Sequence, residues 1–166
     1  MQRHPGCGVT IKHFAANNQE TNRYGSNSMA SERALREVYL RGFEIAVRDG
    51  APRAVMTSYN LINGVHTSER RGLTQDVLRS EFGFRGIVMT DWIIGALNMG
   101  AKKYPAPNAA RIAAAGGDLV MPGGRSDLKA MLKGLKSGAV TRWQLVINAS
   151  RVIRTARLLN AKERQE

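Results

Sequence analysis

The sequence has very little cysteine, with Cys7 as the only thiol among 166 residues. One thiol cannot form an internal disulfide, and it excludes the paired-cysteine motifs of zinc and redox sites. Long apolar runs are also absent, since nowhere do about 18 apolar residues follow one another. Residues 1–8 lack the apolar segment of a signal peptide. We therefore expect a soluble chain without a signal peptide, for which cytoplasmic and secreted locations both remain open.

Acidic residues are few, because 13 Asp and Glu face 25 Lys and Arg, which gives a formal net charge of +12. Such an excess can indicate a polyanionic partner. The basic residues are, however, scattered through amphipathic segments, with no compact basic run and no zinc, helix-turn-helix or RNA-module signature. We interpret them as solvated surface charge and predict no nucleic-acid partner. A basic nucleic-acid binder is the least favoured alternative, and a steep salt dependence of DNA binding would identify it.

Low-complexity tracts and charge blocks are absent too, so nothing in the composition predicts disorder. The 43% hydrophobic content, 17 Gly and 5 Pro are those of a globular protein. At this length one domain is the default, and we assign residues 1–166 to it with a frayed tail at 161–166.

Strand and helix patterns alternate along the chain. Ser31 is a candidate N-cap and Gly50 a candidate C-terminal cap of the first helix, and Asn63-Gly64 predicts a turn. Ser126 is a candidate N-cap of a later helix, Gly138 is expected to end that helix, and Thr141 to start the last one. The predicted strands are 9–14, 54–59, 86–90 and 118–121, and the predicted helices are 31–48, 74–82, 108–115, 126–136 and 141–158.

Four strand–helix units with polar or aromatic residues at the strand ends predict an α/β fold, half of a (β/α)₈ barrel. The run 86–90 is almost wholly apolar, as in a strand buried within a parallel sheet. An open flavodoxin-like sheet is the alternative, but no glycine-rich nucleotide loop follows the first strand.

Asp91 and Trp92 stand together at the end of the third predicted strand. An indole packs on the apolar face of a sugar ring, while a carboxylate can attack or stabilise its anomeric carbon. Position alone therefore makes Asp91 the best candidate nucleophile of a sugar site.

Several motifs, in order and spacing, closely resemble glycoside hydrolase family 3 over nearly the whole chain. Any one of them alone would be a weak signal. The motifs are Lys12-His13-Phe14-Ala15-Ala16-Asn17-Asn18-Gln19-Glu20 with Arg23, Val55-Met56-Thr57-Ser58-Tyr59-Asn60, Ile62-Asn63-Gly64, Leu78-Arg79-Ser80-Glu81-Phe82-Gly83-Phe84-Arg85-Gly86, Val88-Met89-Thr90-Asp91-Trp92, Ala115-Gly116-Gly117-Asp118 and Met121-Pro122.

The resemblance implies a β-glucosidase-type enzyme that needs neither metal nor cofactor and takes a β-glucoside or oligosaccharide as substrate. Asp91 would be the nucleophile. One group of residues would bind the hydroxyls of the sugar, and another would line the subsite that holds it. The binding group is Lys12, His13 and Arg23, and the lining group is Met56, Tyr59 and Trp92.

Other interpretations stand beside these. Lys12 and Arg23 could be solvated charges, and Met56 and Tyr59 could be core strand residues. Asp118 is expected to brace loops through hydrogen bonds rather than to act in catalysis. We interpret Glu20 and Glu81 as packing or capping groups.

Retaining hydrolysis uses two carboxyl groups about 5 Å apart. In most family members the acid/base comes from a second domain, and the preceding half of the barrel adds an acidic residue and an arginine. The resemblance therefore implies little or no activity for this chain alone. The alternatives are a non-catalytic truncated fragment and a carbohydrate-binding or interaction module, and β-xylosides or glucans are alternative substrates.

A half barrel would expose sheet edges and the inward faces of its strands. We therefore expect either that two copies associate as a homo-oligomer that covers these surfaces, or that the structure rearranges locally.

Overall fold

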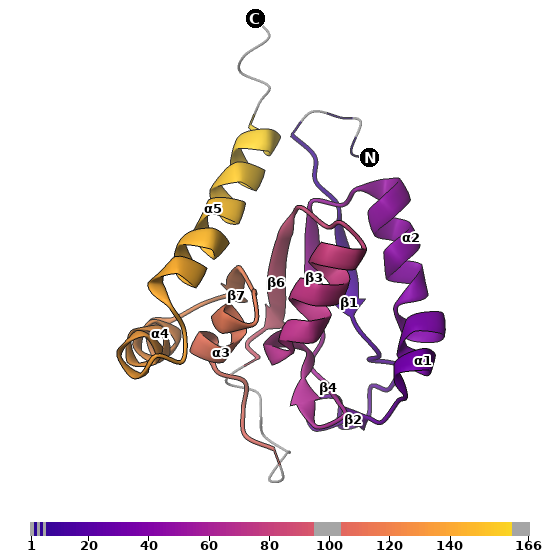
Figure 1. Ribbon diagram of the computed structural model, residues 1–166, viewed down its shortest axis with the longest axis horizontal. Coiled ribbons are helices and arrows are strands. Elements are labelled where there is room, and N and C mark those ends of the chain that lie inside the picture. The colour runs from indigo at the N-terminus through magenta and orange to yellow at the C-terminus, as the bar shows by residue number, and fades with distance from the viewer. Residues whose placement is uncertain (1, 3, 5, 95–103, 161–166) are drawn as a thin grey trace, which may run out of the picture.

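The computed structural model describes residues 2, 4, 6–94 and 104–160. Its centre is a parallel sheet whose strands follow one another in sequence order (Figure 1). This order, with helices between the strands, is that of consecutive units of a (β/α) barrel. The strands are β1 (Thr10–Phe14), β3 (Ala54–Thr57), β6 (Ile87–Trp92) and β7 (Leu119–Met121).

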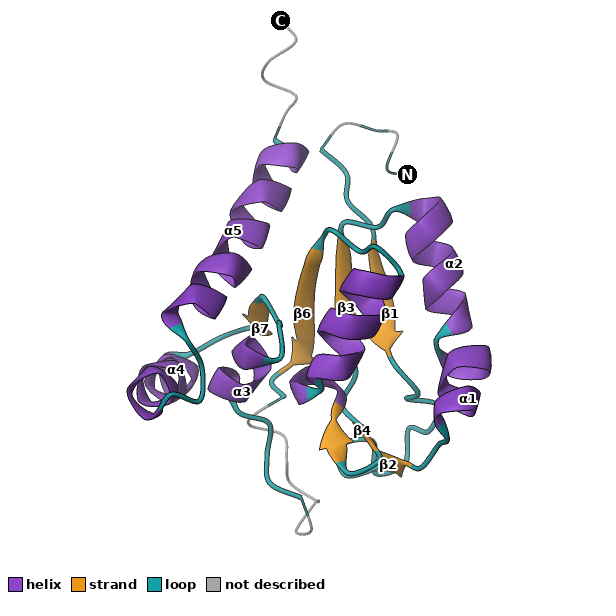
Figure 2. Cartoon of the chain, in the orientation of Figure 1, coloured by secondary structure: helices purple, strands orange, loops and turns teal. Residues whose placement is uncertain are grey.

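Helices connect these strands. Figure 2 shows α1 and α2 beyond β1 on one side of the sheet, and α5 on the other side. The helices are α1 (Glu32–Ala34), the π-type turn η1 (Leu35–Tyr39), α2 (Arg41–Gly50), the 3₁₀ turn η2 (Thr67–Glu69), the π-type helix η3 (Gly72–Glu81), α3 (Ala109–Ala114), α4 (Arg125–Ser137) and α5 (Arg142–Leu159).

The main core lies between one face of the sheet and the helices. Val55 pairs with Val88 in register, and both are buried in one apolar cluster with Leu78. Because successive side chains of a strand point to opposite faces, the neighbouring pair Met56 and Met89 lies on the other face. Both methionines are only half-buried. The sheet therefore has one covered and one partly open face, and the predicted partial barrel is confirmed.

Several predicted helix ends are confirmed. Ser31 accepts a hydrogen bond from the Ala34 amide, and Thr141 accepts one from the Gln144 amide. Gly138 ends α4 in the left-handed conformation.

Other predicted ends are wrong. Gly50 is the last residue of α2, and Ala51 adopts the left-handed conformation in its place. Helix α4 begins before Ser126, with Gly124 at its N-cap position and no side-chain cap. Helix η3 begins at Gly72, two residues before Thr74.

The predicted turn at Asn63-Gly64 is confirmed, because both residues have positive φ. It joins two short strands that form a small second sheet, which the sequence patterns did not predict. That sheet has the order β2 (Asn27–Ser28), β4 (Leu61–Ile62) and β5 (Val65–His66).

None of the helices in the described part of the chain is both long and apolar enough to cross a lipid bilayer. The predicted frayed tail, residues 161–166, lies outside the described residues.

Candidate active site

Asp91 lies at the carboxyl end of β6, within the strand rather than after it. Asp91 is 7% exposed, and its Oδ1 accepts a hydrogen bond of 2.7 Å from the Trp92 amide. Strand β6 pairs with β3 on one side and β7 on the other, so the backbone at Asp91 is held in the sheet. Trp92 is 50% exposed. A buried carboxylate and an exposed indole therefore follow one another at the end of this strand.

His13 reaches Asp91 from β1, on the far side of β3. The distance between His13 Nε2 and Asp91 Oδ2 is 3.4 Å. Because parallel strands end at the same edge of the sheet, residues 78 positions apart in the chain meet here.

Tyr59 follows β3 and lies at the same edge. Its hydroxyl donates to the Trp92 carbonyl oxygen at 2.8 Å. Burial, with a further contribution from the Asp91 carboxylate, raises the pKa of Tyr59 to about 12. Tyr59 therefore keeps its proton next to the carboxylate at neutral pH.

Arg23 and Tyr24 bring the loop after β1 onto Tyr59. The guanidinium carbon of Arg23 lies 4.9 Å from the centre of the Tyr59 ring and 5.1 Å from that of Tyr24. The two tyrosine rings meet edge to face at 4.7 Å. The hydrogen bond to the Tyr24 hydroxyl raises the pKa of Arg23. This stack of two rings and one cation fixes the loop beside Asp91.

Lys12 and Met56 are less closely tied to this group. Lys12 is exposed on β1, and the contacts of the described residues do not join it to Asp91. Met56 is half-buried on the open face of the sheet, one residue before the end of β3. The structure thus brings together His13, Arg23, Tyr59, Asp91 and Trp92, with Lys12 and Met56 at the margin.

Asn60 and Tyr24 are two residues to which sequence analysis gave no role. The buried Asn60 side-chain amide lies 3.3 Å from the Ala15 oxygen, 3.0 Å from the Ala16 oxygen and 3.2 Å from Ser28 Oγ. These partners are 32 to 45 residues away in sequence, so only the fold reveals them. The motif position directly after Tyr59 was the one available signal.

Asp118 makes bracing contacts, as predicted, but to two helices and a strand rather than to loops. Its carboxylate pairs with Arg79 at 2.6 Å and Arg151 at 3.2 Å, and it accepts a hydrogen bond of 2.8 Å from the Val88 amide. This cluster lies before β7 begins and joins η3, β6 and α5.

The interpretation of Glu20 and Glu81 as packing or capping groups is wrong. Glu20 forms an exposed ion pair with Arg23 at 2.7 Å. Glu81 forms ion-pair contacts with Arg36.

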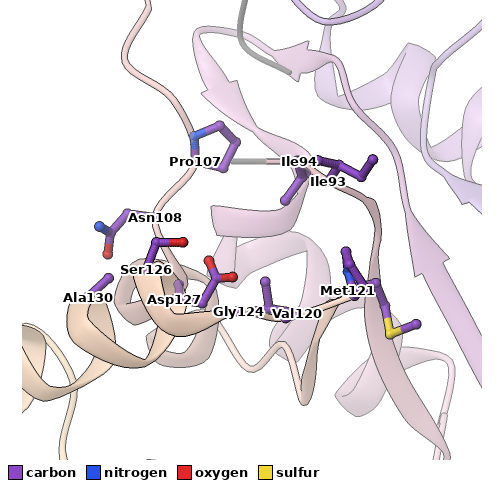
Figure 3. A pocket seen from close by; sticks show the side chains of 13 residues that line it. Ile93, Ile94, Pro107, Asn108, Val120, Met121, Gly124, Ser126, Asp127 and Ala130 are labelled. Atoms are coloured by element: carbon purple, nitrogen blue, oxygen red, sulfur yellow. The ribbon is translucent and has the colours of Figure 1, made fainter. Parts of the chain in front are cut away.

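A hollow of about 380 Å³ adjoins the ends of β6 and β7. Ile93, Ile94 and Met121 line one side of it, and the Ser126 hydroxyl and Asp127 carboxylate of α4 line another (Figure 3). Among the described residues no group of three or more His, Cys, Asp or Glu side chains could hold a metal ion.

These features define a partial (β/α)-barrel domain whose mouth carries a carboxylate, an indole, an imidazole and a guanidinium. A model of the glycosyl hydrolase family 3 N-terminal domain matches residues 1–155. The chain belongs to this family.

Known relatives agree with that assignment. Beta-glucosidase B of Emericella nidulans is 43% identical over 160 residues, which cover 95% of this chain and 18% of that protein. An exo-alpha-(1->6)-L-arabinopyranosidase of Bifidobacterium longum is 54% identical over 87 residues, covering 52% of this chain and 12% of that protein. The structure of beta-glucosidase 3B from Thermotoga neapolitana with alpha-D-glucose matches with a TM-score of 0.80 at 39% identity, covering 92% of this chain and 21% of that chain. The chain thus spans between 12% and 21% of the length of these relatives.

Proposed function

We propose that this chain is the nucleophile-bearing part of a retaining glycoside hydrolase that removes terminal β-D-glucosyl or related residues. The observation that carries the proposal is the buried Asp91 carboxylate at the carboxyl end of β6, with His13 Nε2 3.4 Å from its Oδ2 and the exposed Trp92 as the next residue of the strand. The names of the relatives support glucose, and the arabinopyranosidase among them leaves room for a related pyranose.

In the proposed reaction Asp91 attacks the anomeric carbon, and the aglycone oxygen leaves with a proton from a general acid. The covalent glycosyl-enzyme is then cleaved by water with retention of configuration. Trp92 and Met56 would pack on the sugar ring, while Lys12, His13 and Arg23 would bind its hydroxyls. Tyr59 would be a hydrogen-bond donor beside the nucleophile, and its pKa of about 12 keeps it protonated well above neutral pH.

The described residues place no general acid near Asp91 that could protonate the leaving group. Within the described ranges, the contacts of the Asp91 carboxylate come from His13, Tyr59 and the Trp92 amide, and none is a second carboxyl group. We therefore expect slow turnover or none from this chain alone, with glycosylation retained for substrates whose leaving group needs no proton.

The test is intact-protein mass spectrometry after incubation with 2-deoxy-2-fluoro-β-D-glucosyl fluoride. One sugar adduct per chain is expected, mapping to Asp91 after proteolysis. Asp91→Asn should give no adduct. Asp127→Asn is the matched control, because it removes a carboxylate from the neighbouring hollow, and it should be labelled like the parent chain.

If folded protein gives no adduct, or if the adduct maps elsewhere, Asp91 is not a competent nucleophile in this chain. Titration with glucose, followed by NMR, would then show whether the chain is a carbohydrate-binding module or a non-catalytic fragment.

A further inference from the structure

A second hollow of about 380 Å³ lies at the other end of the sheet, where the strands begin. Four segments contribute to it: Val47 of α2, residues 51–53 before β3, residues 83–86 before β6, and the last turns of α5. Figure 1 shows these strand starts and the end of α5 on the side of the molecule away from the carboxyl end of β6. The hollow is therefore separate from the candidate active site.

Its lining is cationic. Arg53, Arg85 and Arg154 contribute to its wall, and no Asp or Glu of the described residues does. Arg157 lies beside Arg154 in an adjoining shallow depression. None of these four arginines takes part in the ion pairs found in the described part of the chain. Their positive charge is available to a ligand.

The position of Arg154 is fixed by the protein itself. Its Nη2 donates to the Arg85 carbonyl oxygen at 3.0 Å, which joins α5 to the loop before β6. Burial, together with the charges of Arg151 and Arg154, lowers the pKa of Arg79 to about 10. The single Asp118 carboxylate thus stands against several guanidinium groups at this end of the sheet.

Apart from Thr155, the other side chains of the wall are apolar. Val47, Pro52, Phe84 and Leu158 contribute to it. Leu158 is 54% exposed, so its apolar surface is accessible to a ligand. A cationic wall next to an apolar wall suits an anion that carries an apolar substituent.

We propose that this hollow is a binding site for a small organic phosphate monoester. The phosphate would lie on Arg53 and Arg154, because planar guanidinium groups bind phosphate oxygens through paired, charge-assisted hydrogen bonds. The organic group would pack on the exposed side chain of Leu158. No step of the proposed glycosidase reaction depends on this site.

The test is isothermal titration calorimetry of the full chain with phenyl phosphate and with inorganic phosphate, at equal ionic strength. Saturable binding of one phenyl phosphate per chain is expected, several-fold tighter than that of inorganic phosphate. Arg154→Gln and Arg53→Gln should each weaken binding about tenfold, the effect of losing one hydrogen bond to a charged group. Circular dichroism should show that both variants remain folded.

Arg142→Gln is the matched control, because it removes an exposed arginine from the opposite end of α5 and should leave binding unchanged. Leu158→Gln should weaken phenyl phosphate binding but not inorganic phosphate binding. If Arg142→Gln and Arg154→Gln lost equal affinity for phenyl phosphate, binding would be due to diffuse surface charge, and the proposal of a specific site would be wrong. Equal affinities for the two probes would overturn the ester specificity, and absence of saturable binding would overturn the proposal.

Discussion

At the scale of single residues, Tyr59 has a property that can be measured without substrate. Burial and the Asp91 charge raise its pKa to about 12. In a spectrophotometric titration of the folded chain, one tyrosine should ionise about two pH units later than ordinary tyrosines, and this step should vanish in Tyr59→Phe. Tyr39→Phe, at a half-buried position on η1, is the control and should leave the late step in place. Ionisation of all tyrosines near pH 10 would contradict the described environment.

The same pKa has a consequence for stability. Unfolded Tyr59 loses its proton near pH 10, whereas folded Tyr59 keeps it to about pH 12. Between these values the folded state binds more protons, so the contribution of Tyr59 is complete below pH 10 and is lost as the pH rises through 12.

Asp118 allows a prediction of stability. Its side chain is fully buried between two arginines, so Asp118→Asn leaves Arg79 and Arg151 without a counter-charge. We expect unfolding in urea to show a loss of about 3–5 kcal/mol. Glu37→Gln, which breaks the exposed pair with Arg33, should cost less than about 1 kcal/mol. A similar small loss for both variants would show that the buried cluster does not stabilise the chain.

At the scale of elements, the contact between α3 and α4 depends on a glycine. A Cβ added to Gly134 would lie 2.4 Å from Ala110 Cβ, and both belong to helices. Gly134→Ala should therefore force the helices apart and cost about 1–3 kcal/mol, measured as a lower melting temperature.

Gly42→Ala is the control on α2, because its added Cβ would meet nothing within 4 Å. It should raise stability by about 0.5–1 kcal/mol through the greater helix propensity of alanine. Equal effects of the two substitutions would contradict the close contact at Gly134.

The order and type of the main elements could be predicted from the sequence because each depends on a local pattern. Apolar runs indicated the strands, and Ser31 and Thr141 marked helix starts by their capping chemistry. Helix ends and short strands that depend on tertiary packing could not be predicted. Ala51 takes the left-handed conformation that glycine usually provides, and strands β2 and β4 exist only because distant segments meet.

The candidate site shows the same division. Position at a strand end and motif resemblance pointed to Asp91 and Trp92, and the structure places His13 and Tyr59 beside them. The stack on Tyr24 and the contacts of Asn60 depend on loop closure over tens of residues, which no local pattern encodes.

At the scale of the whole molecule, one face of the sheet is only partly covered in the described part of the chain. Met56 and Met89 are partly exposed there, next to the unpaired edge of β1 in the described sheet. Partly open apolar faces favour association. In sedimentation velocity the chain should therefore form dimers, and Met89→Glu should shift it towards monomer by placing a charge on this face. A monomeric parent chain that does not aggregate would contradict this prediction.

Asn60 has a consequence for engineering the mouth of the barrel. One buried amide holds the backbone at Ala15 and Ala16 and the side chain of Ser28, at the two ends of the loop that carries Arg23. Both ends of this loop are therefore held by one residue outside it, Asn60. Exchanging the segment between these ends, with Asn60 kept, would be the most economical route to a different sugar preference.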